Sequence, residues 1–238
     1  MSTAVLEVSE LDGFYGSVPI LQSVNFTVGS EPFVILGRNG MGKTTLCRAL
    51  MGLLPKTTGR VTFLGDQVVG SKPHKIATRG VGYVPQGRGI FPSLSTDEHL
   101  RMLRPSSKSS WQIDDVYELF PRLHQRRKIG AGQMSGGEQQ MLAIGRVLLS
   151  DPRLLILDEP SEGLAPSIVT LLAETLTKLN DAGVSILLVE QNVRLAAAVG
   201  KTAKIMTNGS IGAEIDCQAL ISDEEVQRRF LGVDVASK

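Results

Sequence analysis

The fold of this chain is decided by the stretch Gly37-Arg38-Asn39-Gly40-Met41-Gly42-Lys43-Thr44-Thr45, which fits the pattern G-x-x-x-x-G-K-S/T. An apolar run at residues 33–36 precedes it, as expected of a buried strand, and the apolar spacing after it predicts a helix over residues 43–54, before Pro55. Glycines allow a tight turn in which several backbone N–H groups point at phosphate oxygens, and the N-terminus of the helix also favours anions. The stretch therefore predicts a nucleotide held by its phosphates.

Two side chains of this stretch have specific expected roles. Lys43 is expected to reach the β- and γ-phosphates, and the Thr44 hydroxyl is expected to bind Mg²⁺. The alternative is a chance glycine turn before a helix, and the complete match at a strand–helix junction counts against it. The candidate nucleotide-binding residues of the stretch are Gly37, Arg38, Asn39, Gly40, Gly42, Lys43, Thr44 and Thr45.

A second apolar run, Leu154-Leu155-Ile156-Leu157, is followed at once by Asp158 and Glu159. A core strand that ends in two carboxylates places them at the carboxyl edge of a parallel sheet, where the phosphate loop also lies. Asp158 is expected to hold Mg²⁺ and Glu159 to align the attacking water, since phosphoryl transfer depends mainly on positioning and charge stabilisation. The alternative, in which the pair only caps the next helix, is weakened by the phosphate loop.

The remaining segments predict an α/β fold in a single domain, residues 1–238. A parallel-sheet core of about residues 1–86 and 151–238 is split by a helical insert of about residues 87–150. Strands are expected at residues 6–8, 23–28, 33–36, 59–64, 80–84, 154–157 and 184–189, and helices at residues 166–180 and from about 193. A C-terminal hairpin is expected around Asn208-Gly209.

Composition disfavours several other classes of protein. The 238 residues carry a formal net charge of +1, so nucleic acid is not expected as the main partner, and the basic cluster at residues 122–128 is interpreted as a solvated face. The N-terminus lacks a secretory pattern, and no apolar run approaches the roughly 20 residues that span a membrane, which predicts a soluble, cytoplasmic chain. Cys47 and Cys217 make no disulfide framework, and the three histidines lack metal-ligand spacing.

A third motif, Met134-Ser135-Gly136-Gly137-Glu138-Gln139-Gln140, lies upstream of the acidic strand. In this order, the three motifs make the chain resemble the ATP-binding-cassette ATPases over essentially its whole length. The resemblance implies a P-loop NTPase core of the RecA type, with an N-terminal antiparallel β-subdomain and an inserted helical lobe. It also implies a dimer closed around ATP, in which Ser135, Gly136 and Gly137 bind the γ-phosphate of ATP held by the opposite subunit.

The same resemblance gives roles to three further side chains. Tyr15 would stack on adenine, Gln86 would contact Mg²⁺ or water, and Gln191 stands where the family has its switch histidine. Gln191 can hydrogen-bond a phosphate or water but cannot carry a proton, which leaves Glu159 as the favoured water-positioning residue.

Two other departures from the family pattern are Glu138 and the sequence Ser161-Glu162-Gly163-Leu164-Ala165, which lacks the usual aspartate. Four segments make the chain resemble the shorter ATPase of bacterial importers of branched-chain amino acids, or of urea and short amides. They are Val189-Glu190-Gln191-Asn192, Glu162-Gly163-Leu164-Ala165-Pro166, the phosphate loop from Leu36 to Thr45, and Pro85-Gln86-Gly87-Arg88 followed by Ile90-Phe91-Pro92. The implied partners are a second ATPase subunit, identical or different, two membrane permease subunits and, indirectly, a periplasmic solute-binding protein. The chain would lie on the inner face of the cell membrane, with Phe91 either a groove anchor for a permease helix or an ordinary core residue.

Two other functions stay open at this point. A cassette ATPase that serves DNA repair or the ribosome would carry a long coiled coil or two cassettes in one chain, and neither pattern is present in the sequence. A small-molecule kinase would share the phosphate loop, but the Ser135-Gly136-Gly137 segment before Asp158 argues against it.

Overall fold

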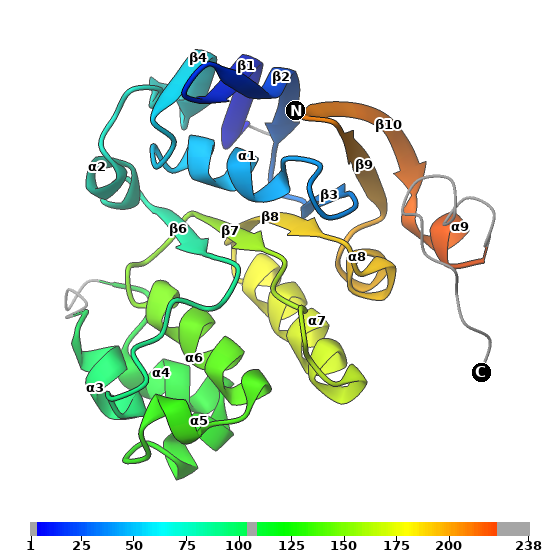
Figure 1. The fold of residues 1–238 in the computed structure, drawn as a ribbon. Coiled ribbons are helices and arrows are strands. Elements are labelled where there is room, and N and C mark those ends of the chain that lie inside the picture. The colour runs from blue at the N-terminus through cyan, green and yellow to red at the C-terminus, as the bar shows by residue number, and fades with distance from the viewer. Residues whose placement is uncertain (1–3, 104–108, 223–238) are drawn as a thin grey trace.

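The computed structural model describes residues 4–103 and 109–222, whose strands form two sheets (Figure 1). The first sheet contains β1 (Leu6–Tyr15), β2 (Val18–Val28), β4 (Lys56–Phe63) and β5 (Asp66–Gln67). Its strand order is β2-β1-β4-β5, and all of its pairs are antiparallel. This sheet confirms the antiparallel N-terminal part that the sequence predicts.

The second sheet contains β3 (Phe33–Leu36), β6 (Val81–Val84), β7 (Leu154–Asp158), β8 (Ser185–Glu190), β9 (Thr202–Thr207) and β10 (Ser210–Asp216). Its strand order is β10-β9-β3-β8-β7-β6, and every pair except β10 with β9 is parallel. The last two strands form the predicted hairpin, in which Asn208 and Gly209 both have positive φ angles, as in a type I′ turn.

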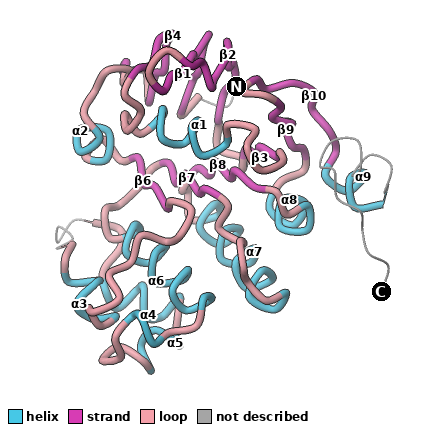
Figure 2. Tube along the Cα trace, viewed as in Figure 1, coloured by secondary structure: helices cyan, strands magenta, loops and turns pink. Residues whose placement is uncertain are grey.

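Both faces of the second sheet are covered (Figures 1 and 2). Helix α1 (Lys43–Leu50) packs between the two sheets, and Leu154 and Ile156 of β7 point into that core. Leu155 and Leu157 point into the other core, with α6 (Gly136–Leu148), α7 (Pro166–Asp181) and α8 (Val193–Val199). A strand buried on both faces reads as a continuous apolar run, which is the pattern of β7. The α/β fold is therefore as predicted.

Four short elements gather with α6 on one side of the molecule (Figure 1). They are α3 (Thr96–Arg101), α4 (Ile113–Leu119), α5 (Pro121–Gln125) and the 3₁₀ helix Ala131–Gln133. The division into a core lobe and a helical lobe, with boundaries near residues 86 and 150, stays a prediction. Two helices were not expected from the sequence: α2 (Pro73–Ala77) and α9 (Cys217–Ser222).

The predicted helix over residues 43–54 is wrong at its end, because α1 stops at Leu50. The chain turns at Gly52, which has a φ of +66°. A Cβ at this position would also lie 2.5 Å from the carbonyl oxygen of Ser71, so only glycine fits there. Cys47, on the same helix, is fully buried as a small core residue, as expected.

Candidate functional site

Residues 37–42 form the predicted phosphate loop, between the end of β3 and the start of α1. Because β3, β7 and β8 are parallel neighbours, with Leu36 opposite Glu190 and Asp158 opposite Val189, the loops after them lie at one edge of the sheet. A Cβ on Gly37 would lie 2.7 Å from a carbonyl oxygen of β9, so this position needs glycine. Gly42 has a φ of +102°, a backbone conformation that residues with a side chain rarely adopt.

The Lys43 side chain is buried inside this loop, with 3% of the residue exposed. Its Nζ donates hydrogen bonds to the carbonyl oxygens of Gly37 at 2.7 Å and Arg38 at 2.8 Å. It also forms an ion pair with Glu159 Oε1 at 2.8 Å. A buried ammonium group needs such partners, because burial alone strongly disfavours its charged form. Lys43 therefore connects the phosphate loop to the residue that follows β7.

Hydroxyl groups from two elements, α1 and β6, bond to Asp158, which is fully buried at the end of β7. Its carboxylate oxygens accept hydrogen bonds from Thr44 Oγ1 at 3.1 Å and from the Tyr83 hydroxyl at 3.2 Å. Gln86 Oε1 lies 3.4 Å from the same Thr44 oxygen. Burial raises the pKa of Asp158, and the two hydroxyl donors oppose that rise. Burial also raises the pKa of Tyr83, so its hydroxyl stays protonated and donates.

Glu159 occupies the left-handed region, with a φ of +48°, a conformation that costs a non-glycine residue free energy. Its N–H donates to the carbonyl oxygen of Val189 at 2.8 Å, which fixes it against β8. Its carboxylate accepts from Gln86 Nε2 at 3.5 Å, in addition to the ion pair with Lys43. The strained backbone thus directs the Glu159 carboxylate toward both the phosphate loop and Gln86.

Gln191 lies in the loop after β8, next to the loop that carries Glu159, and its side chain is partly exposed. Its N–H donates to the Glu190 carboxylate at 2.8 Å. Hydrogen bonds and the ion pair thus bring together five of the predicted site residues, and the parallel pairing places Gln191 in the adjacent loop. The five residues are Lys43, Thr44, Gln86, Asp158 and Glu159.

The motif at residues 134–140 forms the N-terminus of α6. Ser135 caps the helix in a capping box, in which Glu138 N–H donates to Ser135 Oγ at 3.3 Å and Ser135 N–H donates to Glu138 Oε2 at 2.8 Å. Gly137 faces α7 so closely that a Cβ would lie 2.8 Å from Ile168 Cγ2. Among the described residues, no hydrogen bond or close approach joins Ser135, Gly136 or Gly137 to the phosphate loop of the same chain.

The remaining predicted residues lie around the phosphate loop. Tyr15 ends β1, is 39% exposed, and has the Arg48 guanidinium 5.9 Å from its ring centroid. Arg38, Asn39 and Gly40 are exposed at the tip of the loop. Thr45 is half-buried in the first turn of α1.

Sequence reasoning missed several residues of this region, among them Tyr83 and Arg88. The Tyr83 hydroxyl, which bonds to Asp158, had one available signal: a polar group inside an apolar strand. Arg88 connects the loop after β6 to two other elements, because its guanidinium donates to Gln139 Oε1 at 3.0 Å and to the carbonyl oxygen of Glu162 at 3.4 Å. No local pattern in the sequence indicates these partners, which come from distant segments.

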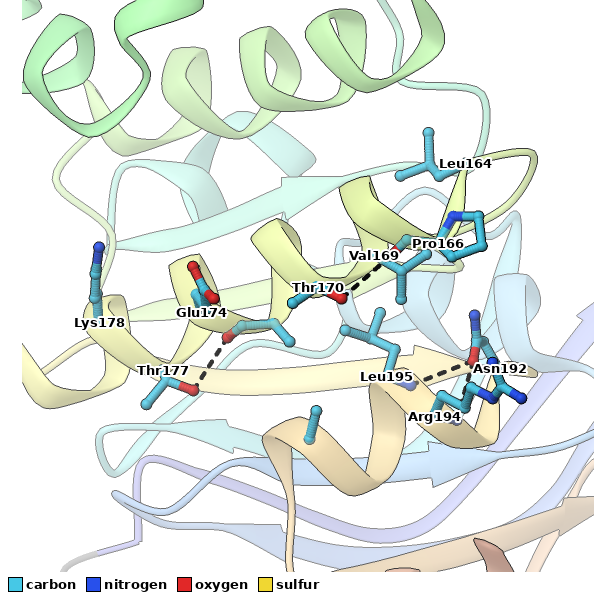
Figure 3. Close-up of a pocket in the computed structure, with 12 residues that line it drawn as sticks. Leu164, Pro166, Val169, Thr170, Glu174, Thr177, Lys178, Asn192, Arg194 and Leu195 are labelled. Atoms are coloured by element: carbon cyan, nitrogen blue, oxygen red, sulfur yellow. Dashed lines mark hydrogen bonds between the residues drawn. The ribbon is translucent and has the colours of Figure 1, made fainter.

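A groove of about 620 Å³ lies between α7 and α8, and Figure 3 shows the residues that line it. No phosphate-loop residue is among them. The Thr170 and Thr177 hydroxyls donate to carbonyl oxygens of their own helix, and Asn192 accepts from the first N–H groups of α8. Because these polar groups are already paired, the loops at the sheet edge are the better nucleotide site.

Comparisons with known proteins show the family of this chain. Residues 21–162 match the protein-family model described as ABC transporter. Over 232 residues, the chain is 38% identical to the high-affinity branched-chain amino acid transport ATP-binding protein BraG of Pseudomonas aeruginosa. This alignment covers 96% of this chain and 100% of BraG. Over 237 residues, it is 32% identical to the lipopolysaccharide export system ATP-binding protein LptB of Escherichia coli, covering 97% and 98%.

The fold also matches a solved structure, the ADP conformation of MJ1267, an ATP-binding cassette of an ABC transporter. The TM-score is 0.82 at 23% identity, over 98% of this chain and 100% of that chain. This chain belongs to the ABC transporter family, and as an ATP-binding subunit it binds and hydrolyses ATP. ATPases of this family work with membrane permease subunits. Within residues 4–103 and 109–222, no helix has the length and apolar character that crossing a membrane requires.

Proposed function

We propose that this chain is the ATPase subunit of a bacterial importer of branched-chain amino acids. The main support is its 38% identity to BraG over the full length of that protein. An importer of urea or short amides is the alternative expected from the sequence. The 32% identity to LptB makes a lipopolysaccharide export system a second alternative. The higher identity to BraG favours branched-chain amino acids as the cargo, which an uptake assay can test.

In this proposal, ATP binds with its phosphates against the backbone N–H groups of residues 37–42 and the N-terminus of α1. The buried ammonium of Lys43 turns from the carbonyl oxygens of its own loop to the β- and γ-phosphates. That movement also breaks its ion pair with Glu159 and leaves the Glu159 carboxylate available to water. The half-exposed ring of Tyr15 stacks on adenine, an interaction typically worth about 1–3 kcal/mol.

Mg²⁺ fits the oxygen atoms of Thr44, Gln86 and Asp158. The Thr44 hydroxyl lies 3.1 Å from Asp158 Oδ1 and 3.4 Å from Gln86 Oε1, so the three side chains present oxygen ligands of the kind that Mg²⁺ prefers. Mg²⁺ usually takes only one or two carboxylates together with substrate phosphates, so a single aspartate is sufficient. When bound, the ion supplies charge neutralisation at the β- and γ-phosphates.

Hydrolysis in this proposal depends on positioning. Glu159 aligns and polarises the attacking water, and its strained backbone holds the carboxylate toward the phosphate loop. Gln86 contacts both Thr44, a proposed Mg²⁺ ligand, and Glu159, which aligns the water. Its side chain therefore links the metal-binding residues to the water-positioning residue. Gln191 hydrogen-bonds the γ-phosphate or the water through a neutral amide.

Two subunits complete the site. Ser135, Gly136 and Gly137, at the N-terminus of α6, bind the γ-phosphate of ATP held by a second ATPase subunit, identical or different. The absence of described contacts between these residues and their own phosphate loop supports this arrangement. Phe91, which is 48% exposed and whose N–H donates to His99 Nε2, contacts one of two membrane permease subunits on the inner face of the membrane. A periplasmic solute-binding protein delivers the cargo.

The test is uptake of labelled leucine and labelled urea in cells whose only copy of this chain carries Glu159→Gln. Loss of leucine uptake alone supports the proposal, and loss of urea uptake alone moves the chain to the amide branch. The matched control is Glu174→Gln, the same chemical change at an exposed position of α7, which should leave uptake at the wild-type level. Unchanged uptake of both solutes in the Glu159→Gln cells would refute both importer assignments.

A further inference from the structure

Glu190, the last residue of β8, is 2% exposed, and its side chain bonds to two loops of the candidate site. Glu190 Oε1 accepts the N–H of Ser161 at 2.9 Å. Glu190 Oε2 accepts the N–H groups of Gln191 at 2.8 Å and Asn192 at 2.9 Å. One carboxylate therefore holds the loop after β7 and the loop after β8 together.

The main chain of the same residue contacts the third loop. The Gly37 N–H donates to the carbonyl oxygen of Glu190 at 3.1 Å. Because this bond does not involve the side chain, any residue at position 190 can keep it. A side-chain substitution of Glu190 therefore changes the link between two loops and leaves the main-chain link to the phosphate loop in place.

The buried negative charge of Glu190 is stabilised by the N–H groups of Ser161, Gln191 and Asn192. Among the residues that the structure describes, no lysine or arginine forms an ion pair with it. Burial raises the pKa of Glu190, and hydrogen bonds from the N–H groups of Asn192, Ser161 and Gln191, together with one from the Ser161 side chain, oppose that rise. An apolar side chain would avoid the cost of burying a carboxylate, but it would leave three N–H donors without an acceptor.

We propose that Glu190 is a positioning residue for ATP hydrolysis, whose carboxylate joins the loop that carries Glu159 to the loop that carries Gln191. This inference rests on the roles proposed above for Glu159 and Gln191. Ser161 is two residues after Glu159, and Gln191 directly follows Glu190, so the carboxylate fixes both loops close to the groups that face the γ-phosphate. Neither loop can then move without the other, and both keep one placement relative to the bound nucleotide.

The variant Glu190→Gln tests this link at constant side-chain size. Its amide oxygen can accept from one side only, and its NH₂ group can only donate. The oxygen is expected to keep the two donors Gln191 and Asn192, so the Ser161 N–H loses its acceptor. Hydrogen exchange resolved to single amides should then be faster at Ser161 by about tenfold or more, while exchange at Gly37 stays unchanged. Unchanged exchange at Ser161 would overturn the proposal.

The matched control is Thr175→Val, which removes a buried hydroxyl that bonds within α7 and touches neither loop. It reports the effect of lost stability alone. In Thr175→Val, exchange at Ser161 should change only as much as in the rest of the chain. If Glu190→Gln showed the same uniform rise as this control, a general structural role would replace the positioning role.

ATP turnover by the 238-residue chain gives the second readout. Glu190→Gln should lower kcat by up to about 10²-fold, the scale of a small misplacement of reacting groups, with the Kd for a fluorescent ATP analogue unchanged. Normal kcat in Glu190→Gln, beside a Glu159→Gln variant with turnover lowered as expected, would overturn the inference. Normal turnover in Glu159→Gln would instead overturn the role proposed for Glu159 itself, so the two failures are distinguishable.

Discussion

Replacing Gly137 with alanine tests the packing of α6 against α7. An ideal Cβ at Gly137 would lie 2.8, 3.0 and 3.1 Å from Cγ2, Cγ1 and Cδ1 of Ile168, whereas carbon atoms pack best at about 3.5–4.0 Å. Gly136 is the matched control, since the three atoms nearest to its Cβ all belong to the guanidinium end of Arg88, at 3.1 to 3.6 Å, so this flexible side chain has to shift by only a few tenths of an ångström. From the sequence alone, the two neighbouring glycines look equivalent.

The expected loss of stability follows from these distances. Helix α6 must move away from α7 by roughly 0.7 Å to restore a contact of 3.5 Å, and overpacking of this kind costs about 1–3 kcal/mol. Against this cost stands the better helix propensity of alanine, at most about 1 kcal/mol. We therefore expect Gly137→Ala to lower the free energy of unfolding by about 1–2 kcal/mol and Gly136→Ala to leave it unchanged or slightly higher. For a chain of this size, the loss lowers Tm by about 2–8 °C.

Thermal unfolding followed by circular dichroism measures both variants. A double-mutant cycle with Ile168→Ala sharpens the test, because this truncation removes all three of the contacting atoms. The penalty of Gly137→Ala should then disappear, which gives a coupling energy of about 1–2 kcal/mol. Equal changes in Tm for the two glycine variants, or no coupling with Ile168, would refute the packing account.

Three further predictions concern other residues. Glu159→Gln should keep ATP affinity, lower turnover by about 10²–10³-fold and trap an ATP-bound dimer. Size-exclusion chromatography in saturating Mg-ATP checks this, and elution as a monomer argues against a homodimer. Lys43→Ala should lose most of its ATP affinity, because the ammonium in the phosphate loop is removed; an unchanged Kd for a fluorescent ATP analogue would contradict that role. Hydrogen bonds from Arg101, chiefly, and from Tyr117 lower the pKa of Asp97. The ionised Asp97 carboxylate therefore stabilises the fold at neutral pH, and this stabilisation is lost as pH falls through the lowered pKa. Asp97→Asn should therefore lower stability by up to about 1 kcal/mol in urea unfolding at neutral pH and by less in strong acid, and an equal loss at both would contradict it.

Most of the second sheet could be predicted from the sequence because its central strands are continuous apolar runs. Buried strands such as β7 and β8 show this pattern without any tertiary information. The end of α1 could not be predicted, since the turn at Gly52 depends on the approach of Ser71 from a distant segment. Helix α2 has only five residues, too few to show helical periodicity.

The candidate site divides in the same way. The phosphate loop could be located because its residues are contiguous, and Asp158 and Glu159 because they end an apolar strand. The partners of Tyr83 and Glu190 could not be predicted, since they are set by which strands pair with which. The Tyr83 hydroxyl meets Asp158 because β6 pairs with β7, and the Glu190 carboxylate meets Ser161 because β7 pairs with β8.

The last prediction concerns Glu138, which places a negative charge in the motif at residues 134–140. Its carboxylate accepts from Ser135 N–H at 2.8 Å and complements the N-terminus of α6, an effect worth about 0.3–1 kcal/mol. The same helix end is proposed to bind a γ-phosphate, so the carboxylate stabilises the helix but repels the ligand. Arg126, 3.6 Å from Glu138, offsets only part of that charge. Glu138→Gln keeps a residue that can complete the capping box, so it should tighten the ATP-dependent dimer at a small cost in helix stability. Analytical ultracentrifugation with Mg-ATP measures the association, and a weaker dimer in this variant would show that the carboxylate assists closure.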